Sequence, residues 1–540
     1  MSKSSSSPRS VRPAGTPAGQ GRGVRRQPAR RGSGTRDAAG SQIHRPHQKA
    51  ARPVAGKPAS AGPASAPAAI GRPGISTQPP RIEAPTEPLR CRIESVDLDG
   101  HGIARQDGKV VFVHGGLPGE LVEARVTRAK PRYSVAEVAS VLEASPNRIA
   151  PRCPHYGICG GCNLQHADVK AQVAFKQRVL EDTLWHLGKV RPAQWLPPIE
   201  GPGWGYRFRA RLTVRDVPTK GGVLVGFHEK SSSYVAPLSE CAILPPRVSA
   251  LLPLLKTLIG SLSIRQRLPQ VEVAVGDCTK PPRHPLALVF RALLPPSPAD
   301  LARLIDFGRA HQAEIWLQPG GPDSIELLCD AEGQRDGVSA LAYELPEFGV
   351  RIPFGPTDFT QVNAGINRVL LSRAVRLLDV QPEDRVVDLF CGLGNFTLPL
   401  GTRARQVIGV EGVPALVARG EANAGLNRAV LLAPPGPQGV SFRAANLFQF
   451  DQAAWQALGP VDKLLIDPPR DGALAVAKVL AALPAGLRPG RMVYVSCNPA
   501  TLARDLGIMV HEGNWRVRQA GVANMFPHTA HVESIALIEP

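Results

Sequence analysis

Residues 385–400 read RVVDLFCGLGNFTLPL, and this stretch decides the fold of the C-terminal part of the chain. The branched apolar residues of 385–390 are typical of a strand buried on both faces. Gly392 and Gly394 follow at once and let the backbone turn sharply, and the run 397–400 predicts the start of a helix. A strand, a glycine turn and a helix in this order predict the first unit of a doubly wound α/β domain.

An acidic residue adds to the signature of a nucleoside pocket. The next predicted strand, 406–410, ends in Glu411, which lies 23 residues after Asp388, where a carboxylate meets ribose hydroxyl groups. Thr397 stands where a dinucleotide fingerprint has its third glycine. The pattern therefore predicts a nucleoside cofactor, although α/β strands also end in Gly and Glu without binding a ligand.

Two further predicted strands end in residues suited to chemistry. Strand 463–466 leads into DPPR (467–470), whose prolines fix the path of the chain at the carboxyl edge of the sheet, where ligands bind. Strand 492–495 leads into SCNP and places Cys497 at the same edge. Cys497 is a candidate nucleophile, and the alternative is a buried, inert cysteine. The alternation of strands and helices from about Glu383 onward predicts a Rossmann-like α/β domain.

A group of cysteines precedes this domain. Cys153, Cys159 and Cys162 have C-x5-C-x2-C spacing in the string CPHYGICGGC. Three thiolates within ten residues favour a metal centre, and both zinc sites and cubane clusters need a fourth ligand. The candidates for that ligand are Cys241, the nearest downstream, and Cys278 and Cys329. The spacing alone leaves zinc and iron–sulfur open.

The N-terminal part differs in composition from the rest. The chain has 540 residues with 64 Lys and Arg and 45 Asp and Glu, a net charge of +19, and residues 1–90 hold 16 of the basic and 3 of the acidic residues. A segment rich in Pro, Gly, Ala and Ser cannot bury enough apolar surface to order its backbone, so 1–88 is predicted to be a disordered basic arm. Such an arm attracts nucleic-acid phosphates. A solvated tail without a partner and an organelle transit peptide are the alternatives.

Two more domains are predicted before the α/β domain of 356–540. Residues 89–145 contain short β-branched runs between glycines and prolines, such as KVVFVH at 109–114, and predict a small OB-like β-barrel. Residues 146–355 mix helix and strand signals and predict an α+β central domain that carries the cysteine cluster. The fold class is thus a Rossmann-like α/β domain with an N-terminal barrel and a mixed central domain.

Composition also bears on the setting of the protein. No run of 18 apolar residues and no secretory signal occurs, so we expect no membrane association. Nine cysteines are too few for a disulfide scaffold, which favours a reducing, cytoplasmic setting. Nothing in the sequence demands an oligomer or an obligate protein partner, so we expect a monomer.

Four strings resemble those of the RNA uracil-C5 methyltransferases that use S-adenosylmethionine. They are DLFCGLGNF, IDPPR, VSCNP and MFPHTAHVE, and the likeness covers roughly residues 89–540 in the family's order. The leading barrel, called TRAM in that family, and the cysteine cluster look like the branch that acts on 23S rRNA, since the tRNA-directed branch typically lacks both. The resemblance implies a [4Fe-4S] cluster held by Cys153, Cys159, Cys162 and Cys241.

The same resemblance implies roles for single residues. It assigns the nucleophile to Cys497 and the proton acceptor to Glu533. Cofactor contacts fall on Gln361, Phe390, Asn395, Glu411, Asn446 and Asp467. Asn446 stands where many methyltransferases carry Asp, and the arm 1–88 has no counterpart in the family's core.

The chemistry of uracil explains why these groups are needed. If the Cys497 thiolate adds to carbon 6, negative charge builds at carbon 5, which can then take a methyl group. The adduct must next lose its carbon-5 proton to a base such as Glu533. His528 and His531 are rival bases, with loop orientation or a phosphate contact as their alternative role. The target must leave its helix or lie in a loop. Phe359 and Phe526 are candidates to stack on it, with a place in the core as their alternative, and Arg470 is a candidate to hold a phosphate.

Four alternatives compete with this prediction. A tRNA uracil-C5 methyltransferase is the nearest one. An adenine amino-methyltransferase carries an aromatic residue where Arg470 stands, and RNA cytosine-C5 enzymes carry a cysteine inside the string that reads DPPR here. A non-catalytic RNA-binding assembly factor has no need of Glu411 and Cys497, so their presence favours an enzyme.

Overall fold

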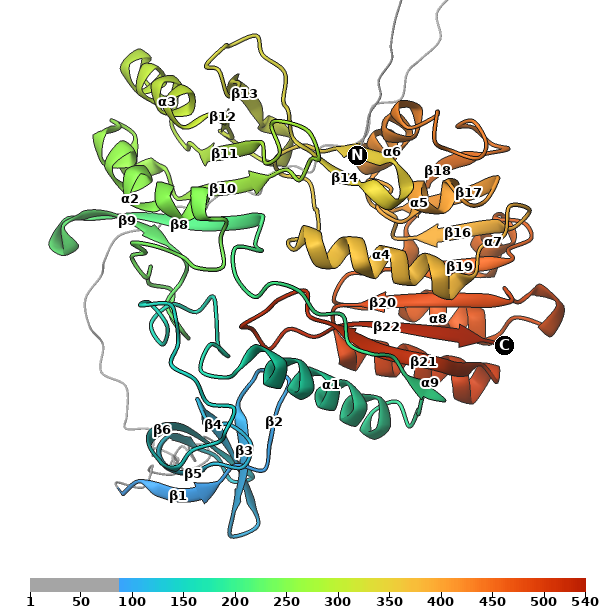
Figure 1. The fold of residues 1–540 in the computed structure, drawn as a ribbon, viewed down its shortest axis with the longest axis horizontal. Helices are drawn as coiled ribbons and strands as arrows, with labels where there is room; N and C mark the ends of the chain where they lie inside the picture. Colours follow the sequence, from blue (N-terminus) through green and yellow to red (C-terminus); the bar gives the residue numbers. More distant parts are fainter. Residues whose placement is uncertain (1–86) are drawn as a thin grey trace, which may run out of the picture. The chain divides into compact units, whose positions relative to one another are not determined.

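The computed structural model describes residues 87–540 (Figure 1). The predicted disordered arm, 1–88, falls almost wholly outside the described residues, and its disorder stays a prediction. Within the described part of the chain, no helix is both long enough and apolar enough to cross a membrane.

The first described domain is a six-stranded sheet that closes on itself. Its strands are β1 (Leu89–Arg92), β2 (Ser95–Val96), β3 (Gly102–Gln106), β4 (Lys109–His114), β5 (Leu121–Ala129) and β6 (Tyr133–Glu143). They pair in the order β1-β5-β6-β4-β3-β2, and only β4 and β6 run parallel. The first segment closes the sheet, because β1 pairs with β5 while Glu94 N–H donates to Ile103 O (2.8 Å) and β2 pairs with β3. This arrangement confirms the predicted OB-like barrel.

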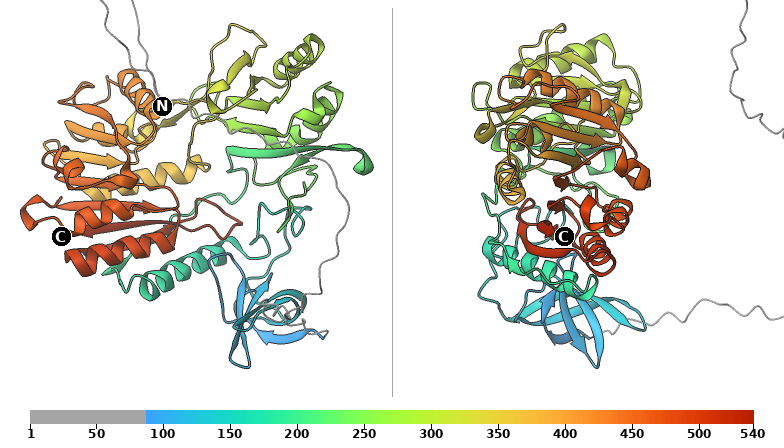
Figure 2. Two further views of the ribbon diagram at one scale, coloured as in Figure 1. Left: turned by 180° about the vertical axis from the view of Figure 1, so that it is seen from behind. Right: turned by 90° about the vertical axis from the view of Figure 1, so that its right-hand side faces the viewer.

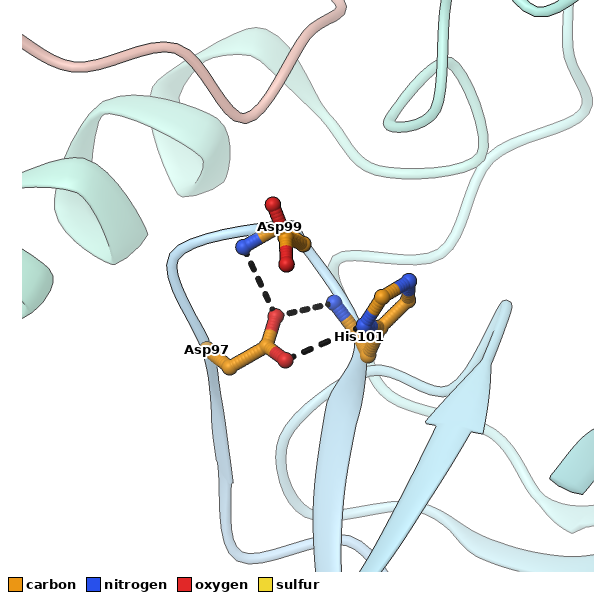
Figure 3. Close-up of side chains that lie close together, drawn as sticks. All are labelled: Asp97, Asp99 and His101. Carbon is orange, nitrogen blue, oxygen red and sulfur yellow. Dashed lines mark hydrogen bonds and ion pairs between the residues drawn. The ribbon is translucent and has the colours of Figure 1, made fainter. Parts of the chain in front are cut away.

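The turn between β2 and β3 is locked by Asp97 (Figure 3). Its carboxylate accepts hydrogen bonds from the backbone N–H groups of Asp99 (2.9 Å) and His101 (2.8 Å), and it lies 3.0 Å from His101 Nδ1. Because these bonds all close the turn itself, Asp97 fixes the shape of the loop. Asn163 Nδ2 donates to Asp99 O (2.7 Å), so the turn is also tied to the cysteine-rich segment.

The central region contains a second six-stranded sheet, in the order β13-β12-β11-β10-β8-β9. Its strands are β8 (Arg209–Val217), β9 (Gly222–Gly226), β10 (Gln270–Val275), β11 (Leu286–Arg291), β12 (Ala313–Leu317) and β13 (Glu326–Cys329). Helices α2 (Pro246–Ser261) and α3 (Pro298–His311) share one apolar core with this sheet. A hairpin of β14 (Ala342–Leu345) and β15 (Val350–Pro353) leads to the C-terminal domain. The mixed α+β character predicted here is confirmed.

The C-terminal domain is built on an eight-stranded sheet in the order β18-β17-β16-β19-β20-β22-β21-β7. Its strands after the hairpin are β16 (Arg385–Leu389), β17 (Gln406–Glu411), β18 (Val440–Ala444), β19 (Lys463–Ile466), β20 (Arg491–Ser496), β21 (Arg516–Ala523) and β22 (Glu533–Glu539). The first five in the sheet order run parallel, and β22 is antiparallel to both of its neighbours. The order reverses between β16 and β19, the switch point at which doubly wound sheets bind ligands.

Helices cover both faces of this sheet (Figures 1 and 2). They are α4 (Ala364–Leu378), α5 (Thr397–Gly401), α6 (Pro414–Leu426), α7 (Gln452–Gln456), α8 (Leu474–Ala481) and α9 (Pro499–Gly513). Alternate residues of β16 divide between two cores: Val387 and Leu389 pack with α8 and α9, and Val386 packs with α4. The predicted Rossmann-like domain is confirmed.

Two elements from the predicted central range 146–355 are part of the C-terminal domain: one is a strand of its sheet, and the other is a helix packed against it. Strand β7 (Gln194–Trp195) pairs in parallel with β21 and forms the eighth strand. Helix α1 (Val169–His186) buries Val173 and Leu180 in the core shared with α8 and α9. A two-residue strand leaves no periodic pattern in a sequence, so composition alone could not place it. The domain limits themselves stay a prediction.

Candidate active site

The carboxyl ends of β16, β17, β19 and β20 open onto one cavity of about 840 Å³. All six residues predicted to contact a cofactor line it: Gln361, Phe390, Asn395, Glu411, Asn446 and Asp467. Cys497 and Glu533 line the same cavity. The structure therefore brings together the eight residues expected to act on cofactor and substrate.

The glycine turn after β16 takes a left-handed backbone at several positions. Phe390 has φ +65°, which is costly for a bulky residue, while Gly392 and Gly394 have φ +54° and +95°. Gly392 N–H donates to Glu411 Oε2 (3.1 Å), and Val413 N–H donates to Glu411 Oε1 (3.1 Å). The carboxylate predicted to meet a ribose is therefore held fixed at the cavity wall.

Thr397, which replaces the third glycine of a dinucleotide fingerprint, has its own partner. Its hydroxyl donates to Asp388 Oδ2 (2.6 Å) beneath the glycine turn. Asp388 is fully buried, and burial raises its pKa to about 8. This hydrogen bond joins the start of α5 to β16 and so stabilises the glycine turn between them.

Asn395 is held by two residues that sequence reasoning missed. Its Oδ1 accepts hydrogen bonds from Tyr343 OH (3.0 Å) and Asn367 Nδ2 (3.0 Å), and its Nδ2 donates to Asn367 Oδ1 (3.1 Å). Tyr343 lies on β14 and Asn367 on α4, so no motif links the three residues in sequence. With its oxygen used in this way, Asn395 has one amide hydrogen left for a ligand.

Asn446, which also lines the cavity, caps a short helical turn. Its Oδ1 accepts from Phe448 N–H (3.1 Å), so its NH2 group remains as the donor toward a ligand. The Phe448 ring is 54% exposed, and its centre lies 5.9 Å from that of Phe390. The two rings give this wall an aromatic surface.

Cys497 lies in the tight connection between β20 and α9. Ser496 ends the strand, Asn498 caps the helix, and Pro499 is its first residue. Asn498 Nδ2 donates to Arg470 O (3.0 Å), which ties this connection to the DPPR segment. Both segments that bear the predicted chemistry are thus fixed to each other at the sheet edge.

Burial governs the ionisation of the acidic groups in the cavity. It raises the pKa of Asp467 to about 7. Glu533 is 3% exposed, and burial together with the nearby Asp467 raises its pKa well above the usual range. Burial, with Glu533 and Asp467 adding to it, raises the pKa of the Cys497 thiol to about 11. The positive charge of Arg470 partly offsets this, because it lowers the pKa of both Glu533 and Cys497.

The two histidines proposed as rival bases have different places. His531 lines the cavity, and Arg470 Nη2 donates to its Nδ1 (3.0 Å); burial and Arg470 lower its pKa to about 4, so the ring is a neutral acceptor. His528 is fully buried, stacks on Trp204 at 3.8 Å and does not line the cavity. This place fits the alternative role of His528, orientation of the loop, better than that of a base. Phe526 also lines the cavity.

Four cysteines face a second, small cavity of about 20 Å³. They are Cys153, Cys159, Cys162 and Cys241, the four that the resemblance assigns to a cluster. Cys278 Sγ instead lies 3.4 Å from Ala342 O, and Cys329 is buried in the central core. Of the three candidates for the fourth ligand, only Cys241 is brought to this cavity.

The spacing of the cysteine sulfurs bears on the kind of metal centre that they could hold. Within residues 87–540, no three cysteines have sulfurs that all lie within 4.8 Å of one another. A tetrahedral zinc with Zn–S bonds of about 2.3 Å needs its sulfurs about 3.8 Å apart. A cubane binds each thiolate at a different corner and holds the sulfurs further apart. The cysteine sulfurs of the described residues are thus less tightly gathered than thiolates bound to one tetrahedral zinc ion would be.

Two family profiles match the chain. The profile described as tRNA (Uracil-5-)-methyltransferase matches residues 353–540, and the TRAM domain profile matches residues 87–139. The first covers the predicted α/β domain and the second covers most of the β-barrel. The strings that suggested the family therefore lie inside the region that its profile matches.

Several curated proteins named 23S rRNA (uracil(1939)-C(5))-methyltransferase RlmD are similar over most of the chain. The protein of Bordetella bronchiseptica is 55% identical over 83% of this chain and 92% of its own length. Those of Azoarcus sp. and Cupriavidus pinatubonensis are 56% and 52% identical, over 83% and 86% of this chain and 98% and 99% of their own lengths.

A solved structure shares the fold over most of the chain. The tRNA (uracil-54, C5)-methyltransferase of Pyrococcus abyssi, in complex with S-adenosyl-L-homocysteine, aligns with a TM-score of 0.61 and 22% identity. The alignment covers 83% of this chain and 99% of the archaeal one. With its curated relatives, its family profile and a cavity lined by the expected residues, the chain belongs to the RNA uracil-C5 methyltransferase family.

Proposed function

We propose that the protein methylates carbon 5 of a uracil in 23S rRNA, with S-adenosylmethionine as the methyl donor and Cys497 as a covalent nucleophile. One observation carries the proposal: Cys497 and Glu533 line the same cavity as the six residues expected to contact the cofactor. The names of the relatives support 23S rRNA as the target. Their identity over most of the chain makes them the better guide than the archaeal tRNA enzyme, which shares only 22% of its residues.

S-adenosylmethionine, when bound, supplies a methyl group on a positively charged sulfur. The glycine turn after β16 allows close approach of a ligand, and Glu411 offers its carboxylate to the ribose hydroxyl groups. The NH2 group of Asn446 can donate to an adenine edge. Asp467, whose pKa burial raises to about 7, is partly ionised near neutral pH, and its ionised form complements a cationic ligand better than a neutral one.

The proposed reaction begins at the sulfur of Cys497. The thiol gives its proton to water, and the thiolate adds to carbon 6 of the uracil, which moves an electron pair onto carbon 5 and the O4 oxygen. Carbon 5 then forms a bond to the methyl group, while the electron pair of the broken carbon–sulfur bond stays on the cofactor. The product at this stage is a 5-methylated base bonded to Cys497.

Glu533 completes the reaction by removing a proton. Its carboxylate takes the hydrogen of carbon 5, the electrons of that bond reform the double bond to carbon 6, and the sulfur of Cys497 leaves. A carboxylate whose pKa is raised by burial is a stronger base once ionised than an exposed one. The burial of Glu533 therefore suits the task of accepting a weakly acidic proton.

The target base must be exposed before it can reach Cys497. Phe359, which is 75% exposed, and Phe526 both line the cavity and can stack on an extruded base. Arg470, held by His531, offers a cation to an RNA phosphate at the cavity wall. These are the roles that we propose for the three residues.

We further propose that Cys153, Cys159, Cys162 and Cys241 hold a [4Fe-4S] cluster. The fit is supported by four cysteines around one small cavity and by the absence, within residues 87–540, of three cysteine sulfurs that all lie within 4.8 Å of one another. A cluster there would join the cysteine-rich segment to the loop before α2. We assign it no step in the reaction.

The decisive experiment uses purified protein, labelled cofactor and an RNA fragment containing the target uracil. We expect Cys497→Ala to abolish both methyl transfer and the covalent RNA adduct seen on a denaturing gel. Methyl transfer by this variant at the parent rate would overturn the mechanism. Comparing 23S rRNA with tRNA as substrates tests the target, and mass mapping of 23S rRNA from a deletion strain identifies the nucleotide.

A further inference from the structure

The loop of residues 524–532, which we call the catalytic loop, carries part of the cavity wall. It joins β21 to β22, and Ala523 pairs with Glu533 across its base. Phe526 and His531 line the cavity from within this loop. Its conformation therefore sets the positions of an aromatic ring, an arginine partner and the neighbouring carboxyl group.

Helix α1 holds the catalytic loop through two side chains one turn apart. Gln172 Oε1 accepts a hydrogen bond from His528 N–H (2.7 Å). Lys176 Nζ donates to Asn524 Oδ1 (2.8 Å) and to Phe526 O (2.8 Å). Residues four apart share one face of a helix, so α1 presents both side chains to the loop. Lys176 binds the loop on either side of Met525.

Lys176 is unusual for a lysine because it is only 2% exposed. In the part of the chain that the structure describes, no carboxylate lies within 4.0 Å of its Nζ. Burial lowers its pKa to about 7. Asn524 is also fully buried, and its Nδ2 has no hydrogen-bond partner. An apolar residue would avoid the cost of burying an unpaired cation, so the two bonds to the loop are what this lysine provides.

We propose that Lys176 is a positioning residue for uracil methylation: its two hydrogen bonds fix the start of the catalytic loop and so hold Phe526 and Glu533 in place around the target base. The inference rests on the proposed function, because it takes Glu533 as the proton acceptor and Phe526 as a wall of the uracil site. Lys176 itself does not line the cavity.

The test replaces Lys176 by Met, which keeps the length of the side chain and removes both bonds. We expect kcat/KM for RNA to fall about 10- to 100-fold, since small misplacements in an active site have effects of this size. KM for RNA rises because Phe526 is loosened, and the covalent adduct lives longer because Glu533 is displaced. The Kd of S-adenosylmethionine stays unchanged, since the glycine turn and Glu411 lie on other segments.

Three further variants make the result specific. Lys170→Met makes the same change at an exposed position of the same helix and is expected to match the parent. Asn524→Asp keeps an acceptor for Lys176 and removes the unpartnered NH2 group, so it is expected to stay within about threefold of the parent. Asn524→Ala deletes one of the two bonds and is expected to act like Lys176→Met to a smaller degree. It replaces Lys176→Met if that variant does not fold.

The outcomes separate this inference from the proposed function. If the parent forms and resolves an RNA adduct, and Lys176→Met or Asn524→Ala does so with unchanged KM, kcat and adduct lifetime, then Lys176 has no positioning role. If Cys497→Ala still methylates RNA, the proposed function fails first, whatever Lys176 does. Loss of cofactor affinity in Lys176→Met would also overturn the inference, since it would show a general structural role.

Discussion

The burial of Cys497 predicts a steep pH dependence for the first chemical step. Its thiol pKa of about 11 means that the thiolate makes up about one part in 10⁴ at pH 7 and about one part in 100 at pH 9. Only the thiolate adds to carbon 6. Raising the pH from 7 to 9 should therefore speed formation of the RNA adduct about 100-fold, or tenfold for each pH unit.

Single-turnover mixing measures this step directly. Enzyme loaded with S-adenosylmethionine is mixed with a short RNA that contains the target uracil, and the adduct is quantified on denaturing gels at intervals from pH 7 to pH 9. Calorimetry at each pH checks that cofactor affinity is constant, and Cys497→Ala supplies the blank. A rate that varies less than threefold over this range would show that the thiol is not the titrating group, and the reasoning from its burial would be wrong.

Four other predictions follow from the structure and the sequence. Glu533→Gln should fold like the parent, because the amide has nearly the size and shape of the carboxyl group and carries no charge into a buried site. It should accumulate the methylated adduct and release the carbon-5 hydrogen about 10²- to 10⁴-fold more slowly, as tritium release would show. Arg148→Ala should cost about 3–5 kcal/mol in unfolding free energy, because it leaves the buried carboxylate of Glu120 without its charged partner, 2.5 Å away. Burial raises the pKa of Glu120, but hydrogen bonds from Arg148 and from backbone N–H groups outweigh it and lower the pKa overall. The stability that the ion pair contributes is therefore present above the ordinary pKa of 4.5 and is lost as the pH falls through the lowered pKa. Melting curves of parent and variant should converge at that low pH. Cys241→Ser should lose bound iron and acid-labile sulfide in elemental analysis, and stoichiometric zinc in the parent would contradict the cluster. Deleting residues 1–88 should weaken RNA binding most at low salt and flatten its salt dependence, and an unchanged salt slope would show that the arm does not touch RNA.

The elements that the sequence predicted well are those with a strong local pattern. Strands 109–114 and 463–466 have the predicted limits, because each is a short run rich in apolar residues that ends at a turn signal, the glycines after 114 or the prolines after 466. The glycine turn and the residues after each parallel strand reach one cavity, because the carboxyl ends of parallel strands meet at one edge. Most of the candidate site therefore followed from where each strand ends.

The parts that the sequence did not reveal depend on contacts between distant segments. Tyr343 and Asn367 hold Asn395, yet each is an ordinary residue in its own segment. Lys176 looks like an exposed residue on a helix until the packing of α1 buries it. The place of His528 away from the cavity likewise depends on its stacking with Trp204. No local pattern encodes such contacts, because their energy arises only when the segments meet.

The eighth strand of the catalytic sheet has a practical consequence for dissecting the protein. A fragment that began at residue 356 would lack β7 and α1, and it would present the backbone N–H and C=O groups of β21 to solvent along an open margin. Uncovered strand margins template pairing with other chains and promote aggregation. A catalytic fragment meant to stay in solution should therefore start before α1, so that it keeps both α1 (Val169–His186) and β7 (Gln194–Trp195) with the C-terminal domain.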